Sequence, residues 1–179
     1  MLNSNSIDLP KLYLLASLAF SFSPASADPV KDFSFQDIKG KRHEFSDYKG
    51  KWVVVNYWAI FCPPCRVEIP DLIRFQNDNP EKVAILGMDA GMDEVQRLQE
   101  FAKDQKINYP IIPTQNSTME AFGEVPGLPA TYIVSPSGEL TDTHVGLLSY
   151  EKLDEYINQK QEPQKEKGFW DKLLGWAIG

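Results

Sequence analysis

The sequence predicts an α/β fold, in which helices flank a central mixed β-sheet and a β-hairpin extends the N-terminal side. Two nearly continuous apolar runs, 51–61 and 82–89, are typical of strands that are buried on both faces. Each of them is followed by a segment with the hydrophobic periodicity of a helix. Later in the chain, two extended runs flank Pro136-Ser137-Gly138, which indicates a hairpin that completes the sheet.

The first 27 residues are typical of a secretory signal peptide. Lys11 precedes an apolar run from about Leu12 to Phe22, and Ala25-Ser26-Ala27 fits a cleavage site. The run is too short to span a bilayer comfortably, and no cysteine near the cleavage point could carry a lipid. We therefore expect export and cleavage after Ala27, into an oxidising compartment where disulfides persist. An uncleaved anchor and an unrelated buried segment are the alternatives.

The mature chain is expected to begin with a hairpin, because alternating apolar residues flank Lys39-Gly40. The strand 51–61 follows. The next helix is expected to begin near Pro64. Proline is tolerated in the first helical turn, because a backbone N–H at that position would have no partner within the helix. Pro70 is expected to kink this helix.

The second half of the chain repeats the alternation of strand and helix. After the strand 82–89, residues 93–105 have the pattern of an amphipathic helix that acidic residues lead. Residues 109–115 are expected to be extended, and a short helix is expected to end at Gly123.

The end of the domain is expected to be a hairpin and a helix. Residues 130–134 and 140–145 read as paired strands, and 149–159 as a helix with Ser149 as its N-cap. Strand, helix, strand, helix, hairpin and helix together give a sheet covered by helices.

Composition limits the domain count and the class of partner. A chain of 179 residues with 42% hydrophobic and 24% charged residues suits one soluble domain. We place that domain at 28–159 and a charged linker at 160–168. The net charge of −7 argues against sequence-independent binding to nucleic acid, which needs clustered Lys and Arg. We expect no cofactor.

Residues 169–179 form an apolar tail with two tryptophans. The tail is too short to span a bilayer. Peripheral contact with the membrane interface, where Trp is favoured, is one expectation for it. Folding back on the domain and docking on a partner remain open.

The chain has two cysteines, Cys62 and Cys65, with only Pro-Pro between them. A bridge between them closes a very short loop and constrains the unfolded chain little, so stability does not explain the spacing. Cys62 falls between the strand and the helix, where backbone N–H groups and the helix dipole favour a thiolate. We expect Cys62 to attack an external disulfide and Cys65, about one turn further in and more buried, to resolve the mixed disulfide.

The segment "WAIFCPPCRVEIP" resembles the active-site segment of the thioredoxin fold, and in particular that of the exported TlpA/ResA-type thiol–disulfide oxidoreductases. The buried strand, the Cys-x-x-Cys, Glu68 and "VPGLPATYIV" occur in the same order. The resemblance implies a thioredoxin-like fold, a periplasmic location and protein thiols and disulfides as substrates. It also implies a membrane electron donor of the DsbD/CcdA type and apocytochrome c or misoxidised proteins as clients.

The resemblance also implies residues that face the client. Pro129 is implied to be a cis-proline beside the dithiol, and the backbone of Leu128 to pair with the client chain; a trans-proline that opens an ordinary strand is the alternative. Pro63 and Pro64 belong to the same expected surface. Trp58 is expected to pack over the dithiol, unless it is an ordinary core aromatic.

Glu68 is the residue that the resemblance assigns to proton transfer. A partly buried carboxylate could accept the proton that Cys65 must lose. The alternative is a solvated glutamate on a helix. Thioredoxins carry an acid where this chain has Asn56, so Glu68 would substitute for it. Phe61 departs from the family, which usually has Trp before the first cysteine.

Three other functions are considered. A Cys₂His₂ metal site with His43 and His144 lacks paired ligand spacing. A peroxidase would need Thr where the chain has Ala59. A non-catalytic module could hold a client in an apolar groove without turnover. Among redox functions, Pro-Pro offers the thiolate no side-chain hydrogen bond, which favours a reductase or isomerase over a dithiol oxidase.

Overall fold

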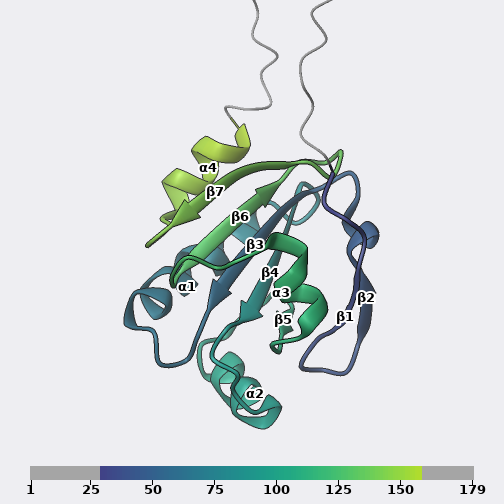
Figure 1. Ribbon diagram of the computed structural model, residues 1–179. Helices are drawn as coiled ribbons and strands as arrows, with labels where there is room; N and C mark the ends of the chain where they lie inside the picture. The colour runs from purple at the N-terminus through teal and green to yellow at the C-terminus, as the bar shows by residue number, and fades with distance from the viewer. Residues whose placement is uncertain (1–28, 159–179) are drawn as a thin grey trace, which may run out of the picture.

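The structure, a computed structural model, describes residues 29–158 (Figure 1). The expected signal peptide at 1–27, linker at 160–168 and tail at 169–179 lie outside the described residues. Within the described residues, no helix combines the length and the hydropathy that crossing a membrane requires.

A five-stranded mixed sheet forms the centre of the fold, with the strand order β5-β4-β3-β6-β7. The central strand β3 (Trp52–Trp58) runs parallel to β4 (Val83–Asp89) and antiparallel to β6 (Ala130–Val134). The short strand β5 (Ile111–Ile112) extends the parallel side, and β7 (Leu140–Val145) pairs antiparallel with β6. The mixed sheet predicted from the sequence is confirmed.

Helices cover one face of this sheet. Residues of α1 (Pro63–Asp78), α2 (Val95–Asp104) and α4 (Tyr150–Asn158) pack in one core cluster with Val54 and Trp58 of β3. Because side chains alternate along a strand, Val53, Val55 and Tyr57 face the other side of the sheet. This alternation explains why both predicted central strands are apolar along their whole length.

The other face of the sheet is covered by the N-terminal hairpin and by α3 (Asn116–Phe122). The hairpin consists of β1 (Ser34–Gln36) and β2 (Arg42–Glu44), which pair antiparallel. Its turn also reaches the edge of the sheet, where the Ile38 N–H donates to the Ile111 carbonyl at 2.9 Å.

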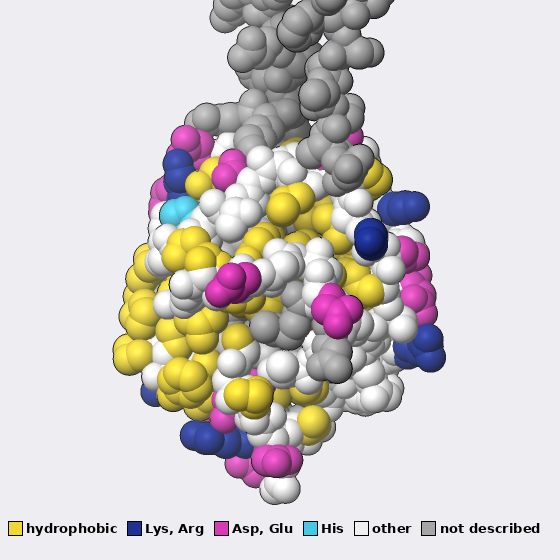
Figure 2. Space-filling model, viewed as in Figure 1, with side chains coloured by type: hydrophobic (Ala, Val, Ile, Leu, Met, Phe, Trp, Pro, Cys, Tyr) yellow, Lys and Arg dark blue, Asp and Glu magenta, His cyan; other side chains and the backbone are white. Residues whose placement is uncertain are grey.

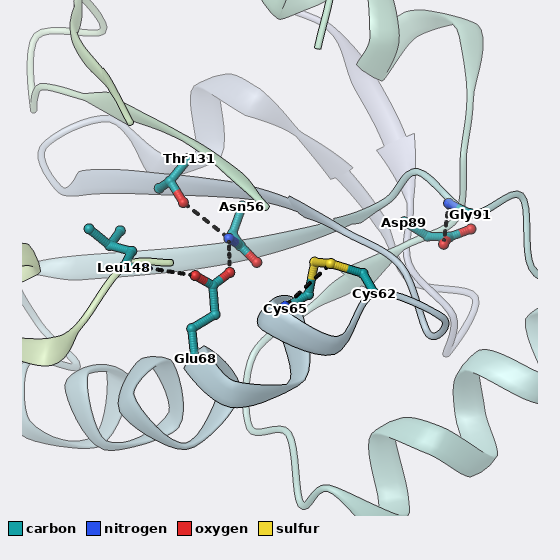
Figure 3. The surroundings of a disulfide bond; sticks show 8 residues. All are labelled: Asn56, Cys62, Cys65, Glu68, Asp89, Gly91, Thr131 and Leu148. Carbon is teal, nitrogen blue, oxygen red and sulfur yellow. Dashed lines mark hydrogen bonds between the residues drawn. A yellow bond between two sulfur atoms is a disulfide. The ribbon is translucent and has the colours of Figure 1, made fainter. Parts of the chain in front are cut away.

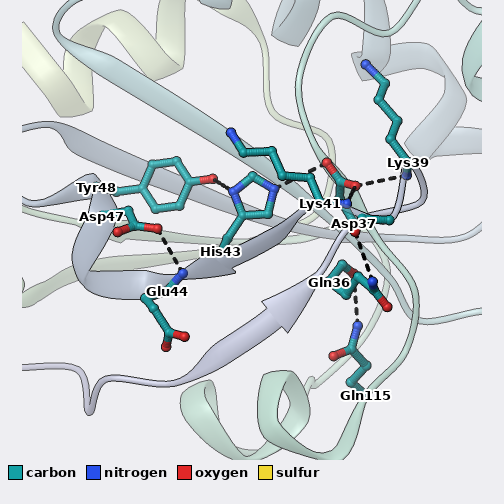
Figure 4. A network of polar contacts seen from close by, with 10 residues as sticks. Gln36, Asp37, Lys39, Lys41, His43, Glu44, Asp47, Tyr48 and Gln115 are labelled. Carbon is teal, nitrogen blue, oxygen red and sulfur yellow. Dashed lines mark hydrogen bonds and ion pairs between the residues drawn. The ribbon is translucent and has the colours of Figure 1, made fainter.

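A buried polar network fixes the hairpin turn (Figure 4). One carboxylate oxygen of Asp37 accepts the backbone N–H groups of Lys39 and Lys41, both at 2.9 Å. Its other oxygen lies 3.2 Å from His43 Nε2, and His43 Nδ1 lies 3.0 Å from the Tyr48 hydroxyl. Both ring nitrogens of this buried histidine are therefore engaged within the hairpin region, as burial of polar groups requires.

Helix bounds differ slightly from the predictions. α1 begins at Pro63, one residue earlier than expected, and continues through Pro70; the expected kink stays a prediction. α2 is shorter than 93–105, because Glu94 is extended and acts as its N-cap. Ser149 caps α4 as predicted, since its Oγ accepts the Lys152 N–H at 3.3 Å.

Gly87 marks the tightest approach within β4. A Cβ at this position would lie 2.7 Å from Ile111 Cδ1, 3.0 Å from Trp58 Nε1 and 3.2 Å from Tyr109 Cε2. The end of the isoleucine can turn away, but two buried aromatic rings have little room to move.

We predict that Gly87→Ala lowers the free energy of unfolding by about 1–3 kcal/mol, because it overpacks the core. Gly127→Ala is the matched control, since its Cβ would approach only Val145 Cγ1, at 4.0 Å. The control should match the wild type or gain slightly, because the unfolded chain loses freedom. Urea denaturation measures both; equal losses in the two variants would contradict the prediction.

Candidate active site

The two cysteines lie where β3 leads into α1 and form a disulfide, with their Cα atoms 5.3 Å apart (Figure 3). Cys62 is the N-cap of α1 and its N–H donates to the Ala59 carbonyl at 3.1 Å. Cys62 is 6% exposed and Cys65 is fully buried. The predicted order of burial is confirmed, and it leaves the Cys62 sulfur as the one nearer the surface.

Pro63 and Pro64 change the electrostatics of the helix start. They occupy the first two helical positions and have no N–H to donate. The first-turn amide that reaches the Cys62 sulfur is that of Cys65, with its nitrogen 3.3 Å from Sγ. A thiolate at Cys62 would thus receive one backbone N–H and the helix dipole, rather than the several N–H groups expected from the sequence.

The Leu128–Pro129 peptide bond is cis, as the resemblance implied. Ala130 pairs with Tyr57, so Pro129 lies at the end of the sheet from which the chain runs to Cys62. The Pro129 carbonyl accepts the Gly146 N–H at 2.8 Å, which fixes the β7–α4 turn against it. Pro129 is buried and Leu128 is half-buried.

Glu68 is buried within α1, with 1% of its surface exposed. Its Oε1 accepts Asn56 Nδ2 of β3 at 2.8 Å, and its Oε2 accepts the backbone N–H of Leu148 at 2.9 Å. Asn56 Nδ2 also donates to Thr131 Oγ1 of β6 at 3.0 Å (Figure 3). The alternative of a solvated helix glutamate was therefore wrong.

Burial raises the pKa of Glu68 to about 7, and the hydrogen bonds from the Leu148 N–H and from Asn56 oppose this rise because they stabilise the carboxylate. A carboxyl group that titrates near neutrality can both accept and return a proton under ordinary conditions. Glu68 therefore has the properties that its assigned role requires, although that role stays a prediction.

Trp58 lies in the core beneath the active-site loop. It is 2% exposed, belongs to the same core cluster as both cysteines, and stacks on Phe101 of α2 with 5.3 Å between ring centroids. Trp58 therefore packs in the same core cluster as the two cysteines, and it is also a buried core aromatic. Any part that it takes in client binding would be indirect, whereas Pro63 and Pro64 are exposed.

Most of the exposed apolar side chains were missed by the sequence analysis. The large hydrophobic residues that are exposed among residues 29–158 are Phe61, Val67, Met92, Val95, Val145 and Leu147. They come from the segment before Cys62, the exposed side of α1, the β4–α2 connection, the first residue of α2, the end of β7 and the β7–α4 turn. β3 and β4 are parallel, so the connections that follow them leave the same edge of the sheet. Two consecutive parallel strands in the sequence could therefore have predicted that Met92, after β4, lies at the same edge as Cys62, after β3.

The two histidines have partners away from the dithiol. His43 belongs to the hairpin network, and His144 of β7 lies 3.2 Å from the Leu147 carbonyl and 3.4 Å from the Tyr156 hydroxyl. No group of three or more His, Cys, Asp or Glu in residues 29–158 is arranged to bind a metal ion. The structure does not assemble the Cys₂His₂ set.

Comparison with known proteins gives consistent matches. Residues 27–143 match the AhpC/TSA family. The thiol–disulfide oxidoreductase ResA of Bacillus subtilis (strain 168) is 29% identical over 140 residues, which cover 77% of this chain and 76% of that protein. A thiol:disulfide interchange protein of the thioredoxin family from Chlorobium tepidum TLS has 27% identity and a TM-score of 0.71, covering 76% of this chain and 98% of that one.

A DsbF homologue from Corynebacterium diphtheriae is also similar, with 25% identity and a TM-score of 0.69 over 77% of this chain and 90% of that chain. These similarities confirm the resemblance drawn from the sequence and the thioredoxin-like fold.

We predict that Glu68 makes the free energy of unfolding depend on pH. Its pKa in the folded protein, about 7, lies above its ordinary value of 4.5, so the folded state binds this proton more tightly than the unfolded state. Its contribution is therefore fully present below pH 4.5 and is lost as the pH rises to about 7. The free energy of unfolding of the wild type should fall relative to Glu68→Gln by about 3 kcal/mol across this range.

Denaturation of both proteins at a series of pH values measures this difference, and groups common to the two proteins cancel. Parallel curves across the whole range would show that Glu68 does not titrate in this window.

Proposed function

The chain belongs to the AhpC/TSA family, and from this premise we propose that it is an exported thiol–disulfide oxidoreductase that reduces or isomerises disulfides of other proteins. The observation that carries the proposal is the position of Cys62 at the N-terminus of α1, bonded to the buried Cys65. Thiol–disulfide exchange needs this arrangement, because one sulfur must reach the client and the other must reach the first.

The reaction runs in two exchanges. In the reduced protein, the Cys62 thiolate attacks one sulfur of a client disulfide; the client S–S bond breaks and one client thiolate leaves. Cys65 then loses its proton to Glu68 and attacks the Cys62 sulfur. The mixed disulfide breaks, the second client thiolate leaves, and the Cys62–Cys65 disulfide forms. Two electrons have passed from the dithiol to the client.

The surface around Cys62 suits an unfolded or partly unfolded protein as the client. Figure 2 shows hydrophobic side chains gathered on the side where the β3–α1 connection and the end of β7 lie in Figure 1. Phe61 is 68% exposed and Met92 is 80% exposed. Exposed apolar patches of this kind are typical of sites that bind apolar segments. The backbone of Leu128, which precedes the cis-proline, would pair with the same segment.

The Pro-Pro pair supports reduction or isomerisation over oxidation. A strong oxidant owes its potential to a stabilised thiolate in the reduced form. Here Pro63 and Pro64 withhold two N–H groups from Cys62. We include in the proposal a periplasmic location, a membrane electron donor of the DsbD/CcdA type, and exported proteins such as apocytochrome c as clients. A dithiol oxidase is the alternative.

We predict that Cys62→Ser abolishes reduction of a protein disulfide such as those of insulin, because the attacking sulfur is gone. Cys65→Ser should instead accumulate a covalent conjugate through Cys62, since nothing displaces the client. Gel electrophoresis without reductant separates the conjugate. A binding module without turnover would retain its client affinity in both variants and form no conjugate.

The direction of electron flow has its own test. We expect the dithiol, equilibrated with glutathione, to have a potential near the thioredoxin value of about −270 mV. A value near that of DsbA, about −120 mV, would support the oxidase alternative instead.

A further inference from the structure

Asn56 is a polar residue at the middle of an otherwise apolar buried strand. It is 1% exposed and lies between Val55 and Tyr57, which are both fully buried. A buried amide lowers stability unless it is hydrogen-bonded. Asn56 Nδ2 donates hydrogen bonds to Glu68 Oε1 at 2.8 Å and to the Thr131 hydroxyl at 3.0 Å. Apolar packing alone would be served better by a branched aliphatic residue here.

The chemistry of Glu68 fixes which way the amide faces. An ionised carboxylate only accepts hydrogen bonds, so the Asn56 nitrogen must face it. The same nitrogen donates to the Thr131 hydroxyl, which occupies its second hydrogen. The amide oxygen is therefore turned to the opposite side. In Figure 3 this is the side on which the disulfide lies, with the amide standing between the Glu68 carboxylate and the sulfurs.

We propose that Asn56 is a positioning residue for proton transfer between Cys65 and Glu68, acting through an amide that contacts the acid with its nitrogen and offers its oxygen to the thiol of the reduced protein. This inference rests on the proposed function and deepens it. It assigns to Asn56 a part in the resolving step, whereas family resemblance assigns such a part only to the glutamate.

The amide matches both protonation states of the pair. Before transfer, the Cys65 S–H donates to Asn56 Oδ1, and Nδ2 donates to the carboxylate. The S–H bond of Cys65 then breaks and an O–H bond forms on Glu68; Asn56 orients the two groups and keeps all its own covalent bonds. The new carboxylic O–H needs an acceptor and the new thiolate needs a donor; a half-turn of the amide supplies both. The Thr131 hydroxyl can follow, because it both donates and accepts.

Among residues 29–158, no cation contributes to the pKa shift of Glu68. Burial raises the pKa of Glu68, and the hydrogen bonds from Leu148 and Asn56 oppose that rise. Titratable side chains in the core cluster on this side of the sheet include Cys62, Cys65 and Tyr109, and the pKa of the Tyr109 phenol is raised first by burial and then by the charge of Glu68. Of the two donors to Glu68, only Asn56 is a side chain, so a substitution can remove it.

The first measurement is the titration of Glu68 by NMR of its labelled carboxyl carbon, in the reduced protein. Asn56→Leu removes a hydrogen bond to the charged form, so the pKa of Glu68 should rise by about one to two units. Asn56→Asp keeps the size of the side chain and places a second carboxyl beside the first; the pair should titrate in two steps, the upper one above the wild-type value. Thr131→Ser keeps the hydroxyl and is the matched control, expected to titrate as the wild type.

The second measurement isolates the resolving step. Cys62 is converted to its mixed disulfide with thionitrobenzoate, and attack by Cys65 releases the coloured thiolate. In Asn56→Leu, release at neutral pH should slow by about 5- to 50-fold, the factor by which that pKa rise reduces ionised Glu68. In a Glu68→Gln background, Asn56→Leu should add no further slowing, because the residue through which it acts is gone.

The outcomes separate the two proposals. If the wild-type mixed disulfide is never resolved by Cys65, the proposed oxidoreductase function fails. If it is resolved, and Asn56→Leu and Asn56→Asp leave the titration of Glu68 unchanged, the Asn56 assignment alone fails. Equal slowing by Asn56→Leu with and without Glu68 would also overturn it, because that is the behaviour of a merely structural residue.

Discussion

The buried carboxylate of Glu68 is the contact on which the geometry of the site depends. It joins four parts of the fold: α1 through its own backbone, β3 and β6 through Asn56, and the β7–α4 turn through the Leu148 N–H. A buried charge is costly without partners, so these parts are constrained to meet at one point. The dithiol helix and the strand that follows the cis-proline are thereby fixed relative to each other.

The same contact explains why the active-site edge of the sheet can be exposed and apolar without losing its shape. The β7–α4 turn carries Leu147, which is 47% exposed, yet it is tied from beneath by the Leu148 N–H and by the Gly146 N–H. Surface hydrophobic residues on a loose loop would tend to fold inward. Here backbone hydrogen bonds to Glu68 and Pro129 supply the constraint, and the apolar side chain of Leu147 stays exposed.

The sequence predicted the parts of this fold that depend on local pattern. Strand β3 was predictable because both of its faces are buried, and the position of the dithiol followed from the end of that strand and the prolines after it. Contacts made by a backbone amide were not predictable: Leu148 lies 80 residues from Glu68 and acts through an N–H that almost every residue has. The exposed position of Met92 depends on a connection whose path only the sheet topology determines.

The Pro-Pro pair affects how readily the Cys62 thiolate forms, and the Glu68 network affects how readily the Cys65 thiolate forms. Prolines at the helix start leave Cys62 with one first-turn N–H, so its thiolate gains less from the helix than it would otherwise. A less stabilised thiolate is a better nucleophile once formed, but it forms less readily. In the proposed mechanism, resolution depends on ionising Cys65, which is fully buried and out of reach of solvent. Glu68 has a pKa near 7, and its partner Asn56 can donate or accept a hydrogen bond, so the pair meets that requirement inside the core. The N-terminus of α1 does not meet it.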